Sequence, residues 1–152
     1  MKATYAIGSD HAGFSLKEII VKYLAQKGFE FVDYGTFDAA SCHYPEYAEK
    51  VADAVADGRH PLGILICGTG VGMSIAANKI PGIRAAAVSD YFSAKYTRLH
   101  NDANILCLGE RITGPGAACE IAEIFLTTLF EGGERHRTRL DIVSAIEKKH
   151  LK

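Results

Sequence analysis

The sequence predicts an α/β fold in which a doubly wound, parallel sheet of five strands is covered by helices on both faces. Short apolar runs alternate with amphipathic stretches to the end of the 152 residues. When a helix follows each strand, right-handed crossovers give a parallel sheet between two layers of helices. No internal repeat, low-complexity segment or linker divides the chain, so we expect one domain over residues 1–152.

The expected strands are short apolar runs that end at turn residues. They comprise residues 4–8, 29–35, 62–67, 84–88 and 104–109. The common doubly wound orders begin either 3-2-1 or 2-1-3, and five strands without a sixth favour 2-1-3-4-5. We therefore expect a three-layer, Rossmann-like sheet with the flavodoxin-like order and a switch point between the first and third strands.

The expected helices show apolar residues at helical spacing, with glycine or proline at several of their ends. They comprise a helix from Phe14 to the stop at Gly28, residues 44–58, 72–79, 90–101 and 116–130, and a C-terminal helix over about 135–149. Pro45 suits the start of the second helix, and Ser89 is the expected cap of the fourth. Ligands of such sheets bind beyond the carboxyl ends of strands at the switch point, which here are the segments 8–13 and 67–72.

Composition argues against several classes of partner. The formal net charge of −1 does not suit a broad surface for nucleic acid or anionic membranes. No apolar run approaches the roughly 20 residues that span a bilayer, and the start MKATYAIGSD has no signal-peptide core. The cysteines Cys42, Cys67, Cys107 and Cys119 show neither a CxxC pair nor metal-ligand spacing. We expect reduced thiols, no metal site and a cytoplasmic location.

The segment CGTGVG, residues 67–72, carries three glycines directly after the third strand. Gly68, Gly70 and Gly72 allow successive backbone N–H groups to converge on an anion. The segment is not a Walker loop, because no GK[ST] follows, and its GxGxG spacing differs from GxGxxG. A tight strand-to-helix turn without a ligand explains the same glycines, so the loop alone leaves both interpretations open.

Cys67, at the start of this loop, is a buried small hydrophobe, a phosphatase nucleophile or a base. A tyrosine-phosphatase loop needs an arginine six positions after its cysteine, where this chain has Met73. A nucleophilic hydrolase needs a general base beside the thiol, and only His11 or His100 could approach through the fold. N–H donors stabilise a thiolate, and they would also stabilise an enediolate formed when a proton leaves carbon. The loop chemistry therefore favours a thiolate base.

Two further polar pairs are candidate site residues. Asp10 and His11 follow the first strand and face the same crevice as the glycine loop. His100 and Asn101 end the fourth helix, which runs antiparallel to the sheet, so they lie near the amino ends of the strands. His100 therefore either interacts with the dipole of its own helix or completes the site of a partner across a dimer.

The densest basic cluster follows a double glycine and contains Arg135, His136, Arg137 and Arg139. Arg135 and Arg139 are four residues apart and share a helical face, so both guanidinium groups could bind one phosphate. A solvated helix face explains the same run. Arg111, just beyond the fifth strand, is a further basic candidate at the carboxyl edge.

Seven motifs carry a resemblance that covers the chain from about Thr4 to Lys149, namely SDHAGF, DYGT, YPEYA, GILICGTGVGMSIAANK, GIRAA, HNDANIL and EGGERH followed by an arginine. Together they resemble the type B ribose-5-phosphate isomerase family, which is related to galactose-6-phosphate and allose-6-phosphate isomerases. The resemblance implies interconversion of D-ribose 5-phosphate and D-ribulose 5-phosphate, a step of the pentose phosphate pathway. It implies ring opening and a cis-enediolate, with no metal or organic cofactor.

The resemblance also implies a role for each candidate. Cys67 would carry the proton between C2 and C1. Family members that lack this cysteine use a glutamate a few residues later instead, and this chain has no acid there before Lys79, which supports Cys67 as the base. Thr69 would contact the reacting oxygens or shuttle a proton between them, and His100 with help from Asp10 would open the furanose ring. The residues implied in substrate binding are Asp10, His11, Gly68, Gly70, Gly72, Asn101, Arg111, Arg135 and Arg139.

The chain departs from the family pattern by one extra residue after the double glycine. Aligning the Arg-His pair selects Arg135 and Arg139 as phosphate ligands rather than Arg137, while Cys42 and His43 receive no role. The resemblance implies a homodimer or a dimer of dimers with the active site shared between subunits, and neither a nucleic acid nor a membrane as partner. An isomerase for a six-carbon sugar phosphate and a non-catalytic phosphosugar-binding module remain as alternatives.

Overall fold

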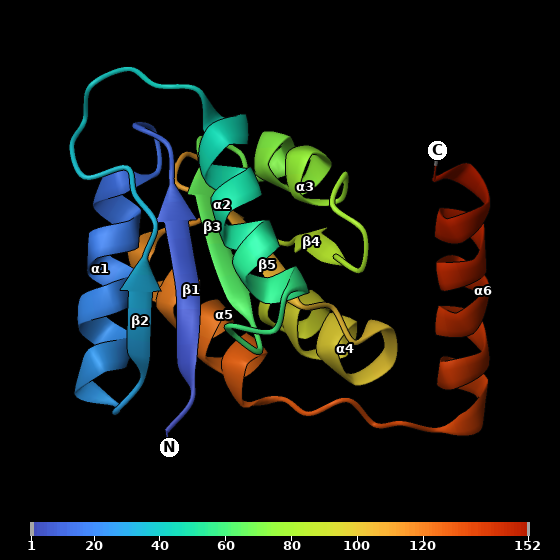
Figure 1. Cartoon of the computed structure of the whole chain (residues 1–152). Helices are drawn as coiled ribbons and strands as arrows, with labels where there is room; N and C mark the ends of the chain where they lie inside the picture. Colours follow the sequence, from blue (N-terminus) through green and yellow to red (C-terminus); the bar gives the residue numbers. More distant parts are fainter. Residues whose placement is uncertain (1, 152) are drawn as a thin grey trace.

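The computed structural model describes residues 2–151 and contains a parallel sheet of five strands with helices on both faces (Figure 1). The α/β fold class predicted from the sequence is confirmed. The strands are β1 (Thr4–Ser9), β2 (Glu30–Asp33), β3 (Gly63–Cys67), β4 (Ala85–Ala87) and β5 (Ile105–Gly109). The helices are α1 (Phe14–Gln26), α2 (Tyr44–Ala56), α3 (Val71–Ala77), α4 (Tyr91–Asn101), α5 (Pro115–Thr127) and α6 (Glu134–His150).

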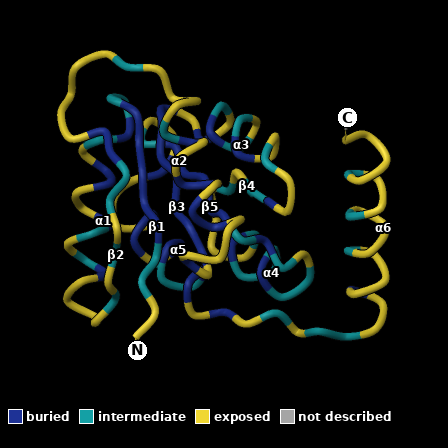
Figure 2. Tube along the Cα trace, in the orientation of Figure 1, coloured by how far each residue is buried: buried dark blue, intermediate teal, exposed yellow. Residues whose placement is uncertain are grey.

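Three layers result because alternate residues of the central strands face opposite sides. Ile64 and Ile66 of β3 pack in one cluster with residues of α1, α4 and α5. Leu65 and Cys67 pack in the other cluster, with residues of α2 and α3. Both β3 and β5 are buried throughout, as Figure 2 shows for the middle of the sheet, which explains why they read as continuous apolar runs. Cys67 is thus a core residue whose neighbours are α2 and α3.

The strand order is β2-β1-β3-β5-β4, so the predicted order 2-1-3-4-5 is wrong in its last two strands. Strand β5 pairs with β3 on one side and β4 on the other. Five fully buried residues suit β5 to this inner place, whereas β4 has three residues of partial burial, which suits an edge. Right-handed crossovers explain why β5 and β4 exchange places. Because α4 covers the same face of the sheet as α1, opposite α3, the crossover after β4 runs back towards the centre of the sheet.

The observed order places the carboxyl ends of β1, β3 and β5 side by side. Ser9 pairs with Ile66, and Cys67 pairs with Gly109. In the predicted order β4 would have stood between β3 and β5. The observed order therefore places the segment that follows β5 directly against the glycine loop.

Helix boundaries agree with the prediction to within a few residues, with one correction at a cap. Asp90, and not Ser89, caps α4, because its Oδ1 accepts a hydrogen bond from the Ser93 N–H at 2.7 Å. A carboxylate at this position satisfies one of the unpaired donors of the first turn. Among residues 2–151, no helix is both long and apolar enough to cross a membrane.

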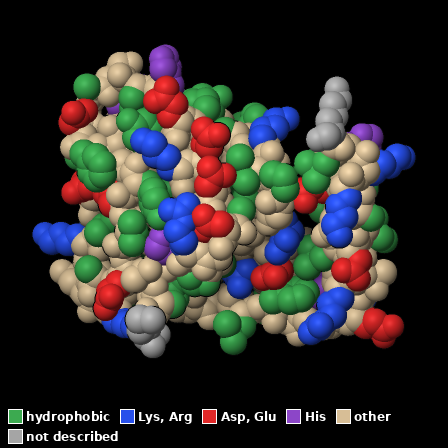
Figure 3. All heavy atoms as spheres, viewed as in Figure 1, with side chains coloured by type: hydrophobic (Ala, Val, Ile, Leu, Met, Phe, Trp, Pro, Cys, Tyr) green, Lys and Arg blue, Asp and Glu red, His purple; other side chains and the backbone are tan. Residues whose placement is uncertain are grey.

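Helix α6 stands apart from the layers and approaches the rest of the described chain mainly along α4 (Figure 1). His136 is its one buried residue in the described range. Ile142, Val143 and Ile146 are at least half exposed. Apolar side chains lie on both sides of the furrow between α6 and the sheet (Figure 3).

A buried ion pair fixes the segment that follows β2. Lys17, on α1, is completely buried, and its Nζ donates to both oxygens of Asp33 at 2.7 Å and to the Thr36 carbonyl. The Phe37 ring covers the ammonium group at 5.0 Å. Because a buried charge is costly without partners, this arrangement holds the chain from Asp33 to Phe37 beside α1.

We predict that Lys17→Met lowers the free energy of unfolding by about 2 kcal/mol, since it leaves the partly buried Asp33 carboxylate without its counter-ion. The matched change Lys2→Met removes the exposed Lys2–Glu30 pair and should cost at most about 0.5 kcal/mol. Urea unfolding followed by circular dichroism measures both. Equal effects of the two changes would show that the Lys17 pair does not fix this segment.

Candidate active site

The loop from Cys67 to Gly72 connects β3 to α3 and presents its backbone at the carboxyl edge of the sheet. Gly70 has φ of +79°, a conformation in which other residues are strained. This turn directs the Gly70 N–H to the Cys67 Sγ at 3.1 Å. Cys67 is 5% exposed, so its buried sulfur meets a backbone donor from its own loop.

Two other glycines allow neighbouring backbones to close around this loop. A Cβ on Gly109 would lie 2.6 Å from backbone atoms of Thr69, and one on Gly13 would lie 2.5 Å from the Ile66 carbonyl oxygen. The Glu110 N–H also donates to the Cys67 carbonyl at 2.9 Å. The loop is therefore held between the segments that follow β1 and β5.

Arg111 lies over the start of the loop, as its sequence position at the carboxyl edge suggested. Its N–H donates to the Gly68 carbonyl at 3.0 Å. Its Nη1 is 3.1 Å from the place that a Cβ on Gly68 would occupy. The guanidinium group thus places positive charge beside the loop, where an anion would meet both it and the backbone N–H groups.

The Tyr44 ring covers the far end of the loop. Its Cζ is 2.9 Å from the position of a Cβ on Gly72, so only glycine leaves room for the ring. Sequence reasoning used Tyr44 only as the start of a helix and missed this contact. The sequence did hold a signal of this contact, because Gly72 lies within α3, and a glycine inside a helix is unfavourable unless something packs against it closely.

Asp10 and His11 lie beside the loop, directly after β1. The Asp10 N–H donates to the Ile66 carbonyl at 3.2 Å, and its Oδ1 accepts from the N–H groups of Ala12 and Gly13 at 2.9 and 3.1 Å. The carboxylate is thereby fixed and 7% exposed. His11 accepts a hydrogen bond at Nδ1 from the Cys42 N–H at 3.2 Å, so the segment before α2 orients the imidazole.

Thr69 is the exposed member of the loop. Its Oγ1 accepts a hydrogen bond from the Val71 N–H at 3.3 Å, which leaves the hydroxyl proton free to donate. Asp10, His11, Arg111 and the glycine loop with Thr69 therefore gather at one edge of the sheet, as predicted.

His100 and Asn101 lie elsewhere, in a groove of about 500 Å³ between α4 and α6. His136 and Arg139 of α6 line the same groove. The His100 and His136 rings stack with centroids 4.3 Å apart and planes at 12°. The groove lining does not include Cys67 or any loop glycine, so one chain does not unite the two sets.

The three arginines of the basic cluster have different environments. Arg139 lines the groove beside His100. Arg135 donates from Nε to His136 Nε2 at 3.3 Å, and Arg137 donates from Nε to the Gly132 carbonyl at 2.6 Å. Arg137 is thus held against the backbone just before α6.

The sequence and the fold were compared with known proteins. The sequence model of a family described as Ribose/Galactose Isomerase matches residues 5–143. The chain belongs to this family. Ribose-5-phosphate isomerase B of Escherichia coli is 49% identical over 144 residues, which are 95% of this chain and 96% of that protein.

Solved structures support the same assignment. Ribose-5-phosphate isomerase B of Clostridium thermocellum has a TM-score of 0.94 at 49% identity and covers 97% of this chain and 99% of its own. The enzyme of Mycoplasma genitalium, solved with bound ribulose-5-phosphate, has a TM-score of 0.90 at 43% identity and covers 97% of this chain and 98% of its own.

In this member of the ribose/galactose isomerase family, the Cys67 sulfur accepts a backbone N–H, which distinguishes it from the core cysteines Cys107 and Cys119. Complete burial raises the pKa of the Cys107 thiol, with a smaller contribution from Cys67. Burial also raises the pKa of Cys119. Both therefore stay protonated in the core, in keeping with their positions in apolar stretches.

We predict that Gly109→Ala displaces the glycine loop, because its Cβ would meet the Thr69 backbone. Overpacking of this kind costs about 2 kcal/mol of stability, and alkylation of Cys67 by iodoacetamide should accelerate as the thiol loses its cover. Urea unfolding and peptide mass spectrometry measure the two effects. Gly116→Ala, whose Cβ would meet nothing within 4 Å, is the control, and equal results for both variants would contradict the close approach.

Proposed function

We propose that this chain is a ribose-5-phosphate isomerase, which interconverts D-ribose 5-phosphate and D-ribulose 5-phosphate without a cofactor. The observation that carries the proposal is the Cys67 thiol, which receives the Gly70 N–H at 3.1 Å inside a loop of further N–H groups. A phosphosugar-binding module needs backbone donors for its anion but has no use for a base. The names of close relatives support the five-carbon substrate.

In this mechanism Cys67 removes the proton from C2 of the open-chain aldose and returns it to C1. The C2–H bond breaks as the C1–C2 double bond of a cis-enediolate forms, and the negative charge moves to the oxygen on C1. The N–H groups of the loop would stabilise that oxygen. Thr69, with its free hydroxyl proton, transfers a proton between the two oxygens.

The remaining residues bind the phosphate and the sugar. His11 and Arg111 beside the loop, with Arg135 and Arg139 of a second subunit, provide the donors for the phosphate, and Arg139 lines the α4–α6 groove. His100 opens the furanose ring in that same groove, and Asn101 binds sugar hydroxyls. Galactose-6-phosphate or allose-6-phosphate isomerisation is the alternative within the family, and the same enediolate chemistry serves both.

The separation of the two sets of residues supports a homodimer with shared sites. Cys67 lies at the carboxyl edge of the sheet, whereas His100 precedes β5 at the amino edge. A second furrow of about 500 Å³ runs between α6 and the β4 edge, and three apolar residues of α6, Ile142, Val143 and Ile146, are at least half exposed. Apolar surface of this kind is typical of subunit interfaces, and the partner would bring its own loop to the groove.

We predict that Cys67→Ala abolishes deuterium incorporation from D2O while the substrate still binds. Proton NMR of ribose 5-phosphate with EDTA should show ribulose 5-phosphate and deuterium at the exchanged carbon with the wild type. The variant should lose about a thousandfold in rate, because general-base catalysis contributes on this scale. Ribose 5-phosphate should still raise its melting temperature.

Cys119→Ala is the matched control, because this thiol lies on α5 and should leave exchange unchanged. Normal turnover by Cys67→Ala would place the base elsewhere. A wild type that ribose 5-phosphate stabilises but that converts neither it nor allose 6-phosphate would establish the binding-module alternative.

We predict that Cys67→Ala and His100→Asn complement each other when subunits exchange. In a two-fold dimer with shared sites, each mixed dimer contains one intact site, so an equal mixture should recover about one quarter of wild-type activity. A spectrophotometric assay before and after mixing measures the recovery. Sites built within single subunits would give no recovery at any mixing ratio.

A further inference from the structure

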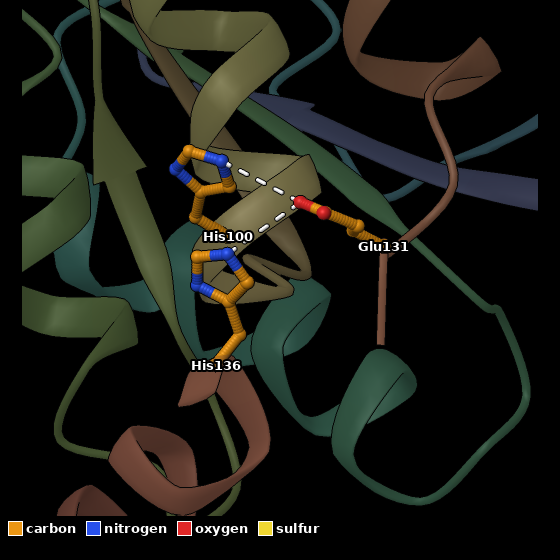
Figure 4. A group of neighbouring side chains, drawn as sticks. All are labelled: His100, Glu131 and His136. Carbon is orange, nitrogen blue, oxygen red and sulfur yellow. Dashed lines mark ion pairs between the residues drawn. The ribbon is translucent and has the colours of Figure 1, made fainter. Parts of the chain in front are cut away.

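Glu131 lies against the two stacked histidines of the groove (Figure 4). Its Oε2 is 3.7 Å from His100 Nε2 and 3.5 Å from His136 Nε2. The three residues come from α4, from the segment between α5 and α6, and from α6. The Glu131 N–H donates to the Leu99 carbonyl at 3.1 Å, which ties the carboxylate to the last turn of α4 beside His100.

The two histidines are not equivalent partners for this carboxylate. Arg135 donates from Nε to His136 Nε2, so that nitrogen carries a lone pair and the ring is neutral with its proton on Nδ1. Burial, the facing His100 and Arg135 lower the pKa of His136, which agrees with the neutral form. His100 Nε2, at an ion-pair distance of 3.7 Å, is therefore the nitrogen whose proton the Glu131 carboxylate would stabilise.

The same three groups do not form a good metal site, although their ligand atoms lie within 4.8 Å of one another. A tetrahedral ion needs lone pairs that converge on one point. The stacked rings lie nearly parallel, so their lone pairs do not converge. Arg135 already occupies His136 Nε2, and Arg139 adds a second positive charge to the groove.

We propose that Glu131 is a positioning residue for ring opening, which rests on the proposed function and on His100 as its catalytic group. The negative charge of Glu131 favours the tautomer with its proton on His100 Nε2, which leaves Nδ1 to act on the sugar. Nδ1 takes the proton of the C1 hydroxyl and returns one to the ring oxygen, while the bond from C1 to that oxygen breaks and the C1 carbonyl forms. The carboxylate stabilises the imidazolium that exists between the two transfers.

Other groups around His100 do not replace Glu131. Tyr96, on α4, meets the His100 ring edge-on at 5.0 Å, and His136 lies flat against it. Arg139, from α6, is positive. Glu131 is thus the one negative group that an ion-pair contact joins to His100 among residues 2–151.

The test separates ring opening from proton transfer. Ribulose 5-phosphate is acyclic, because its C5 oxygen carries the phosphate and cannot close a furanose. Exchange of its C1 hydrogen with D2O therefore needs the base and the loop but no ring opening. Proton NMR measures this exchange and, separately, kcat/KM for ribose 5-phosphate.

We expect Glu131→Gln to lower kcat/KM for ribose 5-phosphate about tenfold, the scale of effect of groups that orient a functional histidine. The exchange rate of ribulose 5-phosphate should stay within about twofold of wild type. Glu134→Gln, the same change at an exposed residue of α6 without an ion pair in residues 2–151, is the control and should alter neither rate. Glu131 is itself half exposed, so the variant should fold, which circular dichroism checks.

Two results would overturn the inference. Equal loss of both rates would show that Glu131 supports the groove in general, and no loss of either would show that His100 does not depend on it. If the wild type catalyses neither reaction, the proposed function itself fails, and the inference fails with it.

Discussion

The close approach of Gly109 to the backbone of Thr69 determines where the chemistry of this protein can lie. Strands β3 and β5 pair through Cys67 and Gly109, so the segments that follow them leave the sheet side by side. A side chain at 109 would separate them. Its absence lets the Glu110 N–H reach the Cys67 carbonyl and lets Arg111 fold back over Gly68. The positions of the Glu110 N–H and of the Arg111 cation beside the loop therefore depend on one packing contact.

Much of this could be predicted from sequence, because the relevant signals are local. The buried run that ends at Cys67 and the glycines after it define a strand followed by a loop. Asp10 and His11 follow another buried run, and parallel strands bring such ends to one edge. The same logic placed His100 at the opposite edge, since α4 runs antiparallel to the sheet. These inferences need only element type and direction, which periodicity reveals.

The order of the last two strands could not be predicted from local sequence signals. Three alanines in β4 do not reveal which neighbour the strand will choose, because that choice depends on which face α4 covers. Ala94 of α4 lies in the core cluster on the face covered by α1 and α5, and the position of α4 on this face reverses the direction in which the chain crosses the sheet. Only the resulting order shows that Arg111 neighbours Gly68. Sequence reasoning had placed Arg111 at the correct edge without being able to give it this neighbour.

Glu131 illustrates the same limit for the site. A single acid in a segment between helices has no periodicity that marks it, and the motif EGGERH that begins with it does not reveal which side chains it will meet. Its position depends on the hydrogen bond to Leu99 and on the stacking of His136 against His100, and both require α4 and α6 to meet. The predicted cap of α4 was wrong for a simpler reason. Ser89 and Asp90 are both good capping residues, and the backbone conformation determines which of them caps the helix.

The division of residues between two edges of the sheet has a consequence for assembly. Strand β5 separates the edges, and five residues of strand extend about 16 Å. An imidazole that opens a sugar ring must lie within hydrogen-bond distance of it, so the proposed chemistry requires a second copy of the chain. In a two-fold arrangement each copy offers its loop to one site and its groove to the other. The segment 128–133 leads from α5 to α6 and carries Glu131, so it would set both the helix that meets the partner and the carboxylate that orients His100. Dimer formation and ring opening would then depend on the same few residues.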